Sequence, residues 1–302
     1  MDNSQSIPAQ PFDAVATGYD AAFTSQRLGQ WLREMVWERL AASFAPGQHV
    51  LELGCGTGED AIWLAQRGVH VTATDASPAM LAETQRKVEQ AGVRDWVTVA
   101  ELDMNALAPP GKPLPNPSPA KGGALDSEWQ KPLPSQGRGW GGVCRDDGLQ
   151  FDGAYSNFGP LNCVQDRPAL FNMLAQSIRP GGRLVLVVMG PVCPWEIGWF
   201  LGHGNLRAAR RRFRAGAEAR VGDSTLRVWY PSQRRLRAEL EPSFRTLEVA
   251  GIGLLLPPSD MGGLVNRAPK LAERLARIDR RMAHTLPWRW LNDHYLLVLE
   301  RR

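Results

Sequence analysis

The stretch that most constrains the fold of this chain runs from Val50 to Asp60 and reads VLELGCGTGED. A short apolar run, typical of a buried strand, leads directly into glycines at alternate positions, and residues 59–68 then have the pattern of a helix that ends at a glycine. Glycine accepts positive φ angles and lets a ligand approach the backbone, and the N–H groups that begin a helix attract acidic groups. The stretch predicts a strand-to-helix turn that binds a nucleoside bearing an acidic group.

The order of apolar patterns along the chain predicts an α/β fold. Strand-like runs alternate with helical runs between residues 49 and 190, and the helix over 77–92 starts with the capping pair Ser77 and Pro78. This alternation predicts a doubly wound, mostly parallel sheet with helices on both faces. The run 244–253 adds a sixth strand. We expect the last run, HYLLVLERR, to complete a seven-stranded sheet as an antiparallel strand.

Two regions depart from this regular alternation. Residues 109–148 are dense in proline and glycine and have no apolar periodicity, which predicts a disordered insertion; a proline-rich partner-binding loop is the alternative. Residues 191–216 predict irregular helical structure, and 224–230 an extra strand, so that about 191–230 would form a substrate cap. Between these regions, the run RPGG at 179–182 predicts a turn before the fifth strand.

The composition limits the kinds of protein to which this chain could belong. The chain has 302 residues, of which 43% are hydrophobic and 22% charged, as in ordinary globular proteins. No apolar run approaches the roughly 20 residues that span a bilayer, and the start lacks a secretory signal, so we expect a cytoplasmic protein with no membrane partner. The four cysteines form no CxxC pair, so the sequence predicts reduced thiols and no metal site.

Arginines are clustered in three runs, although the net charge is only +4. Clusters of this kind can bind phosphates, but they are also common on solvated helix faces. No aromatic-basic pattern of a nucleic-acid-binding module accompanies them, so nucleic acid is not the expected partner. The three runs are RAARRRFR (207–214), RRLR (234–237) and RLARIDRR (274–281).

Acidic residues end two of the neighbouring strands. Asp75 can accept hydrogen bonds from both hydroxyls of a ribose. Met104 can pack on a flat base while Asp103 meets its amine edge. These features also suit a dinucleotide, but dinucleotide folds favour G-x-G-x-x-G, whereas this turn reads G-x-G-x-G with Glu52 two residues earlier.

At this point the sequence resembles the class I S-adenosylmethionine-dependent methyltransferases, of the small-molecule kind grouped with ubiquinone- and menaquinone-biosynthesis enzymes. The resemblance covers about residues 12–190, apart from the insertion. It implies a Rossmann-like methyltransferase domain over 46–302, preceded by N-terminal lid helices over 1–45, and S-adenosyl-L-methionine as the cofactor. The segments that carry it are VLELGCGTGED, VTATDASPAML, ELDMNAL, FDGAYSNFGPLN and SIRPGGRLVLVV.

The resemblance implies a role for each matching residue. The glycines of the turn would line the methionine part of the cofactor, Glu52 would fix the turn and the amino group, and Asp75 would hold the ribose. Asn157 and Phe158 would lie beside the methyl group, and Tyr19 would fold over the cofactor, unless its helix simply packs on the sheet edge. The full implied cofactor-binding set is Tyr19, Glu52, Gly54, Cys55, Gly56, Gly58, Asp75, Ala76, Met80, Asp103, Met104, Asn157 and Phe158.

The acceptor is less constrained. The run SNFG stands where enzymes that methylate nucleobase amines carry an Asn/Asp-Pro-Pro-aromatic run, which favours a small, partly apolar acceptor. Trp195, Trp199 and Phe200 are expected to wall its pocket. No catalytic residue is assigned; His203 and His294 are the candidate bases. An RNA methyltransferase and an NAD(P)-dependent oxidoreductase remain as alternatives.

Overall fold

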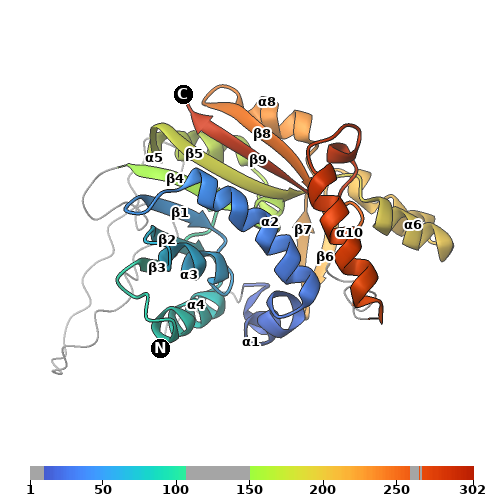
Figure 1. Cartoon of the computed structure of the whole chain (residues 1–302), viewed down its shortest axis with the longest axis horizontal. Coiled ribbons are helices and arrows are strands. Elements are labelled where there is room, and N and C mark those ends of the chain that lie inside the picture. Colours follow the sequence, from blue (N-terminus) through green and yellow to red (C-terminus); the bar gives the residue numbers. More distant parts are fainter. Residues whose placement is uncertain (1–9, 107–149, 259–264, 266) are drawn as a thin grey trace, which may run out of the picture.

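The structure is a computed structural model that describes residues 10–106, 150–258, 265 and 267–302 (Figure 1). Its centre is a seven-stranded sheet in the order β3-β2-β1-β4-β5-β9-β8. The first five strands in this order pair in parallel, and β9 runs antiparallel to both β5 and β8. The predicted fold, with its antiparallel last strand, is confirmed. The strands are β1 (His49–Leu53), β2 (His70–Asp75), β3 (Val97–Glu101), β4 (Phe151–Ser156), β5 (Ile178–Met189), β8 (Phe244–Ile252) and β9 (His294–Arg301).

Helices cover both faces of this sheet, because successive strand residues are apolar on both sides. Val50 packs into one apolar cluster with α2 (Arg27–Ser43), α3 (Glu59–Ala65), α4 (Pro78–Gln90) and α10 (Pro269–Met282). Leu51 points the other way, into a second cluster with α5 (Arg167–Ser177) and α8 (Gln233–Leu240). Burial on both faces is what a mostly parallel sheet requires.

One local prediction, the turn at 179–182, differs from the structure. The run 179–182 does not precede the fifth strand but lies within β5, where the register with β4 shifts between Phe151 and Gly153. Gly181 has a φ of 77°, so the extra residues are accommodated as an irregularity in the strand. The insertion at 109–148 lies outside the described residues.

The segment after β5 is also more regular than the sequence predicts. It forms α6 (Pro194–Gly202), α7 (Leu206–Ala209), the 3₁₀ turn η5 (Arg211–Phe213) and a hairpin. The hairpin pairs β6 (Ala217–Val221), which the sequence analysis missed, with β7 (Ser224–Val228), the predicted extra strand. Short strands that pair only with each other carry a weak sequence signal.

The N-terminal segment packs against the first helices of the sheet. It consists of η1 (Asp13–Val15), α1 (Ala16–Tyr19) and the π turn η2 (Asp20–Thr24). Asp13 accepts a hydrogen bond of 2.5 Å from the Ser77 hydroxyl at the start of α4. Asp20 accepts from Thr57, at 2.6 Å, and from Lys87 of α4, at 2.7 Å. These contacts hold the segment against the end of the sheet where the glycine turn lies.

Within the part of the chain that the structure covers, no helix is long and apolar enough to cross a membrane.

Candidate functional site

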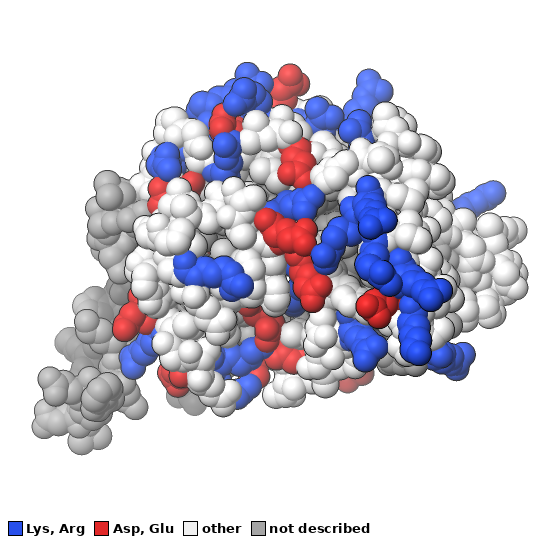
Figure 2. Space-filling model, viewed as in Figure 1, with Lys and Arg blue, Asp and Glu red and all other residues white. Residues whose placement is uncertain are grey.

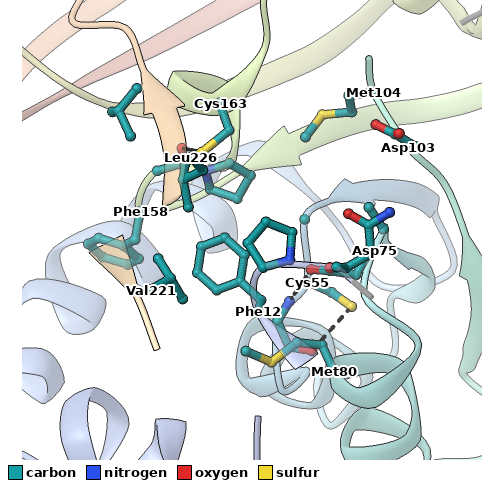
Figure 3. A pocket seen from close by; sticks show the side chains of 18 of the residues that line it. Phe12, Cys55, Asp75, Met80, Asp103, Met104, Phe158, Cys163, Val221 and Leu226 are labelled. Carbon is teal, nitrogen blue, oxygen red and sulfur yellow. Dashed lines mark hydrogen bonds between the residues drawn. The ribbon is translucent and has the colours of Figure 1, made fainter. Parts of the chain in front are cut away.

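A cavity of about 740 Å³ opens at the carboxyl ends of the parallel strands (Figure 3). Its walls come from the residues that follow β1, β2, β3 and β4, from the N-terminal segment and from the β6–β7 hairpin. Ligands of open α/β sheets bind at this edge. The structure brings twelve of the thirteen predicted cofactor residues to the lining: Tyr19, Glu52, Gly54, Cys55, Gly56, Asp75, Ala76, Met80, Asp103, Met104, Asn157 and Phe158.

The three glycines of the turn all need positive φ, but the space around each of them differs. All have positive φ, at 72°, 54° and 78° for Gly54, Gly56 and Gly58. A Cβ on Gly54 would lie 2.3 Å from Pro160, and a Cβ on Gly58 would lie 2.6 Å from Thr84. A Cβ on Gly56 would meet nothing within 4 Å, since it would project into open space. Gly58, the thirteenth predicted residue, does not line the cavity; it caps α3 and lies against α4.

Asp75 is tied to the glycine turn through the backbone. Its carboxylate accepts hydrogen bonds from the N–H of Gly56, at 2.9 Å, and from the N–H of Ser77, at 3.0 Å. Burial raises the pKa of Asp75. A carboxylate has about four acceptor positions, so these two bonds leave it able to accept from a ligand. Asp103 and Met104 line the same side of the cavity, beyond Asp75 in Figure 3.

A buried polar cluster forms another part of the lining. Asp60 accepts hydrogen bonds from Arg33, at 2.7 Å, Trp37, at 2.8 Å, and Asn157, at 2.9 Å. Glu52 is 3% exposed, and burial together with the charge of Asp60 raises its pKa well above the usual range.

Two oxygen atoms of this cluster are unsatisfied. Glu52 Oε2 and Asn157 Oδ1 have no hydrogen-bond partner among the residues that the structure describes. Buried acceptors without donors are uncommon in native proteins, and both residues line the cavity. They mark a place that suits a ligand with hydrogen-bond donors.

Arg33 and Asp60 line the cavity but were not predicted. Asp60 is the last residue of the glycine motif itself. Arg33 interrupts the apolar face of α2 between Leu32 and Val36, and it is only 8% exposed. A charged residue on an apolar helix stripe is the signal that could have identified it.

The other side of the cavity is largely apolar. Figure 3 shows Phe12, Phe158, Val221 and Leu226 facing one another across from Asp75 and Met80. The predicted walls Trp195, Trp199 and Phe200 do not line it, because α6 lies away from the cavity and the β6–β7 hairpin takes that place. The hairpin residues that line the cavity are Ala219, Val221, Leu226, Arg227, Val228 and the following Trp229.

Asn162 positions the hairpin. It lies in η4 (Pro160–Cys163), and its side chain donates to the carbonyls of Met189, at 3.0 Å, and Trp229, at 2.6 Å. Its side-chain oxygen accepts from the N–H of Met189, at 2.9 Å, and its backbone carbonyl from the N–H of Trp229, at 2.8 Å. Asn162 is fully buried, and sequence reasoning missed it because its partners are distant in the chain.

Phe158, on the apolar side, has an unusual backbone conformation. Its φ of 57° is the only positive φ at a non-glycine residue in the described parts of the chain. Left-handed backbone at an aromatic residue is strained and is found preferentially at functional sites. The ring lies edge-on to Phe23 and His294, each with a centroid distance of 5.6 Å, and the Arg33 guanidinium lies 5.6 Å from its centroid.

Neither candidate histidine lines the cavity. His203 is exposed, and its ring nitrogen lies 2.8 Å from the carbonyl oxygen of Trp199. His294 is buried behind Phe158, where its Nδ1 lies 3.0 Å from Asp293. No group of three metal-ligating side chains occurs in the described residues.

Comparisons with known proteins agree with this architecture. A family model described as a methyltransferase domain matches residues 50–114. A demethylmenaquinone methyltransferase of Symbiobacterium thermophilum is 35% identical over 95 residues, which are 29% of this chain and 36% of that protein. An S-adenosyl-L-methionine-dependent Diels-Alderase of a Neonectria species is 37% identical over 82 residues, 26% of this chain and 34% of that protein. The matched stretches thus span about a third of these relatives.

The solved structures extend the likeness to the whole fold. The CcbJ methyltransferase from Streptomyces caelestis superposes with a TM-score of 0.55 at 13% identity, over 98% of this chain and 99% of that one. Identity at this level shows the fold alone. The domain match, the relatives and the fold agree with the motifs of the sequence and with S-adenosyl-L-methionine as the cofactor. Residues 50–114 are therefore similar to a methyltransferase domain, and the chain shares its fold with S-adenosylmethionine-dependent methyltransferases.

Proposed function

We propose that this chain transfers a methyl group from S-adenosyl-L-methionine to a small, largely apolar acceptor by in-line displacement. The observation that carries the proposal is the division of one cavity into a polar side and an apolar side. A methyl transfer of this type needs the nucleophile, the methyl carbon and the sulfur held in line, with water excluded. An apolar wall facing a cofactor pocket suits that requirement.

The polar side fits the cofactor. The amino group of the cofactor carries hydrogen-bond donors, and Glu52 Oε2 and Asn157 Oδ1 are buried acceptors without a donor. Asp75 would accept from the ribose hydroxyls, and Asp103 and Met104 would bracket the adenine. The missing side chain at Gly56 leaves room beside the backbone. When bound, the cofactor supplies an electrophilic methyl group on a sulfonium. The residues around the cofactor would orient it and exclude water.

The regions around the domain would complete the site. In this proposal residues 1–45 are a lid, of which Phe12 and Tyr19 reach the cavity. The main domain spans 46–302, and within it about 191–230 act as the substrate cap through the β6–β7 hairpin.

The lining also bears on the nature of the acceptor. Among the described residues, no histidine or lysine lines the cavity. Its candidate bases are carboxylates, such as those of Asp103 and Asp166. A general base is needed only when the nucleophile is protonated at the working pH, so a lining without histidine favours an acceptor that ionises readily, such as an acidic carbon or an acidic hydroxyl group. The name of the demethylmenaquinone methyltransferase relatives supports an apolar ring compound of this kind.

The earlier alternatives have less support. The family match and the relatives favour S-adenosylmethionine over a dinucleotide. For RNA, the run 207–214 supplies fewer free arginines than its sequence implies, because Arg211 and Arg212 are paired with Glu196.

Cofactor binding and consumption test the proposal separately. Thermal-shift measurements should show stabilisation by S-adenosylhomocysteine and none by NAD or NADP. A panel of phenols, quinols and β-dicarbonyl compounds with methyl-labelled cofactor should then yield labelled product. A product that forms without label and without cofactor consumption would contradict methyl transfer and point to the chemistry that the name of the Diels-Alderase relative describes.

A further inference from the structure

Helix α6 buries its charged residue and exposes apolar side chains, the reverse of an ordinary surface helix. Its only charged residue, Glu196, is 2% exposed, whereas Trp199 and Leu201 are 42% and 49% exposed. A surface helix normally turns its charged face to solvent and its apolar face to the core. In Figure 1, α6 projects from the end of the molecule.

A buried ion network fixes this orientation. Glu196 accepts hydrogen bonds from Arg211, at 2.6 Å, and from Arg212, at 2.8 Å. Arg212 is 5% exposed and also donates to Asp293, which directly precedes β9, at 2.6 Å. Rotating α6 to bury its apolar side would pull Glu196 away from both arginines. The apolar side is therefore held outward by strong and specific contacts.

The apolar surface continues beyond the helix. Leu206 and Phe213, which follow in α7 and η5, are 58% and 57% exposed. Of the ten large apolar side chains that are exposed in the described residues, these two and the pair on α6 come from positions 199–213. Single exposed apolar residues are normal, but such a concentration marks an interaction surface.

Basic side chains surround this surface. Arg207, Arg210 and Arg214 are exposed and make no ion pair within the part of the chain that is described. Residues 191–216 contain no acid other than Glu196, which is buried. Figure 2 shows surface without charged side chains projecting at this end of the molecule, with basic side chains next to it. The segment thus presents apolar anchors beside uncompensated positive charge.

We propose that residues 194–214, the α6–η5 segment, dock on an anionic lipid surface. Tryptophan, leucine and phenylalanine side chains insert at the boundary of headgroups and acyl chains, and nearby arginines are attracted to anionic headgroups. Nine residues in α6 are too few to span a bilayer, so the helix would lie in the interface. The positive charge favours an anionic lipid over a second copy of the chain, which carries the same arginines.

Vesicle co-sedimentation of the full chain tests this. Vesicles with phosphatidylglycerol should bind the chain at least about tenfold more tightly than vesicles of phosphatidylcholine alone. The double variant Trp199→Glu, Leu201→Glu should bind anionic vesicles at least about tenfold more weakly than the unsubstituted chain. Leu247→Glu is the matched control, because Leu247 is 43% exposed but lies in β8; it should bind as the unsubstituted chain does. Circular dichroism and the affinity for S-adenosylhomocysteine should be unchanged in all variants.

Three results would overturn the proposal. The first is that the unsubstituted chain does not bind anionic vesicles. The second is that Leu247→Glu weakens binding as much as the double variant does. The third is a dimer in sedimentation velocity that the double variant abolishes, since the surface would then be a self-interface. None of these results bears on methyl transfer, which is measured with a water-soluble acceptor.

Discussion

The two sides of the cavity are built in contrasting ways. The cofactor side consists of short stretches at the ends of consecutive strands, where residues such as Gly56 and Asp75 lie next to the motif that predicts them. The apolar side, where we propose that the acceptor binds, is assembled from the hairpin and η4, which Asn162 joins; a buried ion network holds η5, the turn that precedes the hairpin. The first combines the backbone geometry of the glycine turn with contacts such as that of Asn157 with Asp60, whereas the second depends on contacts between distant residues alone. They should therefore respond differently to substitution.

The largest effect is expected where the acceptor side is anchored. Arg212→Met would remove the buried cation that Glu196 and Asp293 share and leave each with one remaining partner, Arg211 and His294, at a cost of about 3–5 kcal/mol in the free energy of unfolding. Denaturant unfolding measures this, with Arg211→Met as the control, because the Arg211 side chain is 39% exposed and should cost much less. Equal losses for the two variants would contradict the role of Arg212 as the anchor.

The same anchor predicts a pH dependence. Although burial alone would raise the pKa of Asp293, His294 and Arg212 lower it below its ordinary range. Its contribution to stability is therefore fully present above the pKa of an unfolded aspartate, and it is lost as the pH falls through that range. Acid unfolding of an Asp293→Asn variant should show a shallower loss of stability below about pH 4. An unchanged acid limb would contradict this.

On the cofactor side, Asp75→Ala should weaken S-adenosylhomocysteine binding by about 100-fold, because the ribose would lose a charged acceptor; this corresponds to about 2.7 kcal/mol. Calorimetric titration provides the measurement, and the melting temperature shows whether the fold is retained. Asp95→Ala, at an exposed position between α4 and β3, should bind normally. Unchanged affinity in Asp75→Ala would refute the ribose assignment.

On the acceptor side, Leu226→Ala should raise the KM for the acceptor by about tenfold, because the hairpin would bury less of the acceptor's apolar surface. The affinity for S-adenosylhomocysteine should be unchanged. Leu206→Ala, a comparably small change outside the cavity, is the control. A loss of cofactor affinity in Leu226→Ala would show that the two sides of the cavity are not separable.

The smallest expected effect is the release of a proton when S-adenosylhomocysteine binds. Burial and the charge of Asp60 raise the pKa of Glu52, and a bound ammonium group would lower it again. Binding of S-adenosylhomocysteine should therefore release a fraction of a proton, most strongly at a pH above the ordinary glutamate range. Calorimetry in buffers of different ionisation enthalpy measures this release. Glu52→Gln should abolish it, and a release that persists in that variant would have another source.

The contrast between the two sides also explains what the sequence could predict. The sheet, its order of elements and most cofactor-side residues follow from periodicity and from glycines that need positive φ, as at Gly54 and Gly56. The acceptor wall does not, because Asn162 and Trp229 meet only through tertiary contacts. Apolar composition suggested that Trp199 faces the acceptor, but the burial of Glu196 turns α6 the other way. Predictions failed where a buried charge pair, rather than hydrophobicity, sets the orientation.

The central claim is that one cavity holds the cofactor on its polar side and the acceptor on its apolar side. A crystal structure of the chain with S-adenosylhomocysteine tests it most directly. We predict that the ribose will contact Asp75, the amino group will lie near Glu52 and Asn157, and the sulfur will point past Phe158 toward Leu226. An empty cavity at saturating ligand, or a sulfur that points away from the hairpin, would contradict the claim.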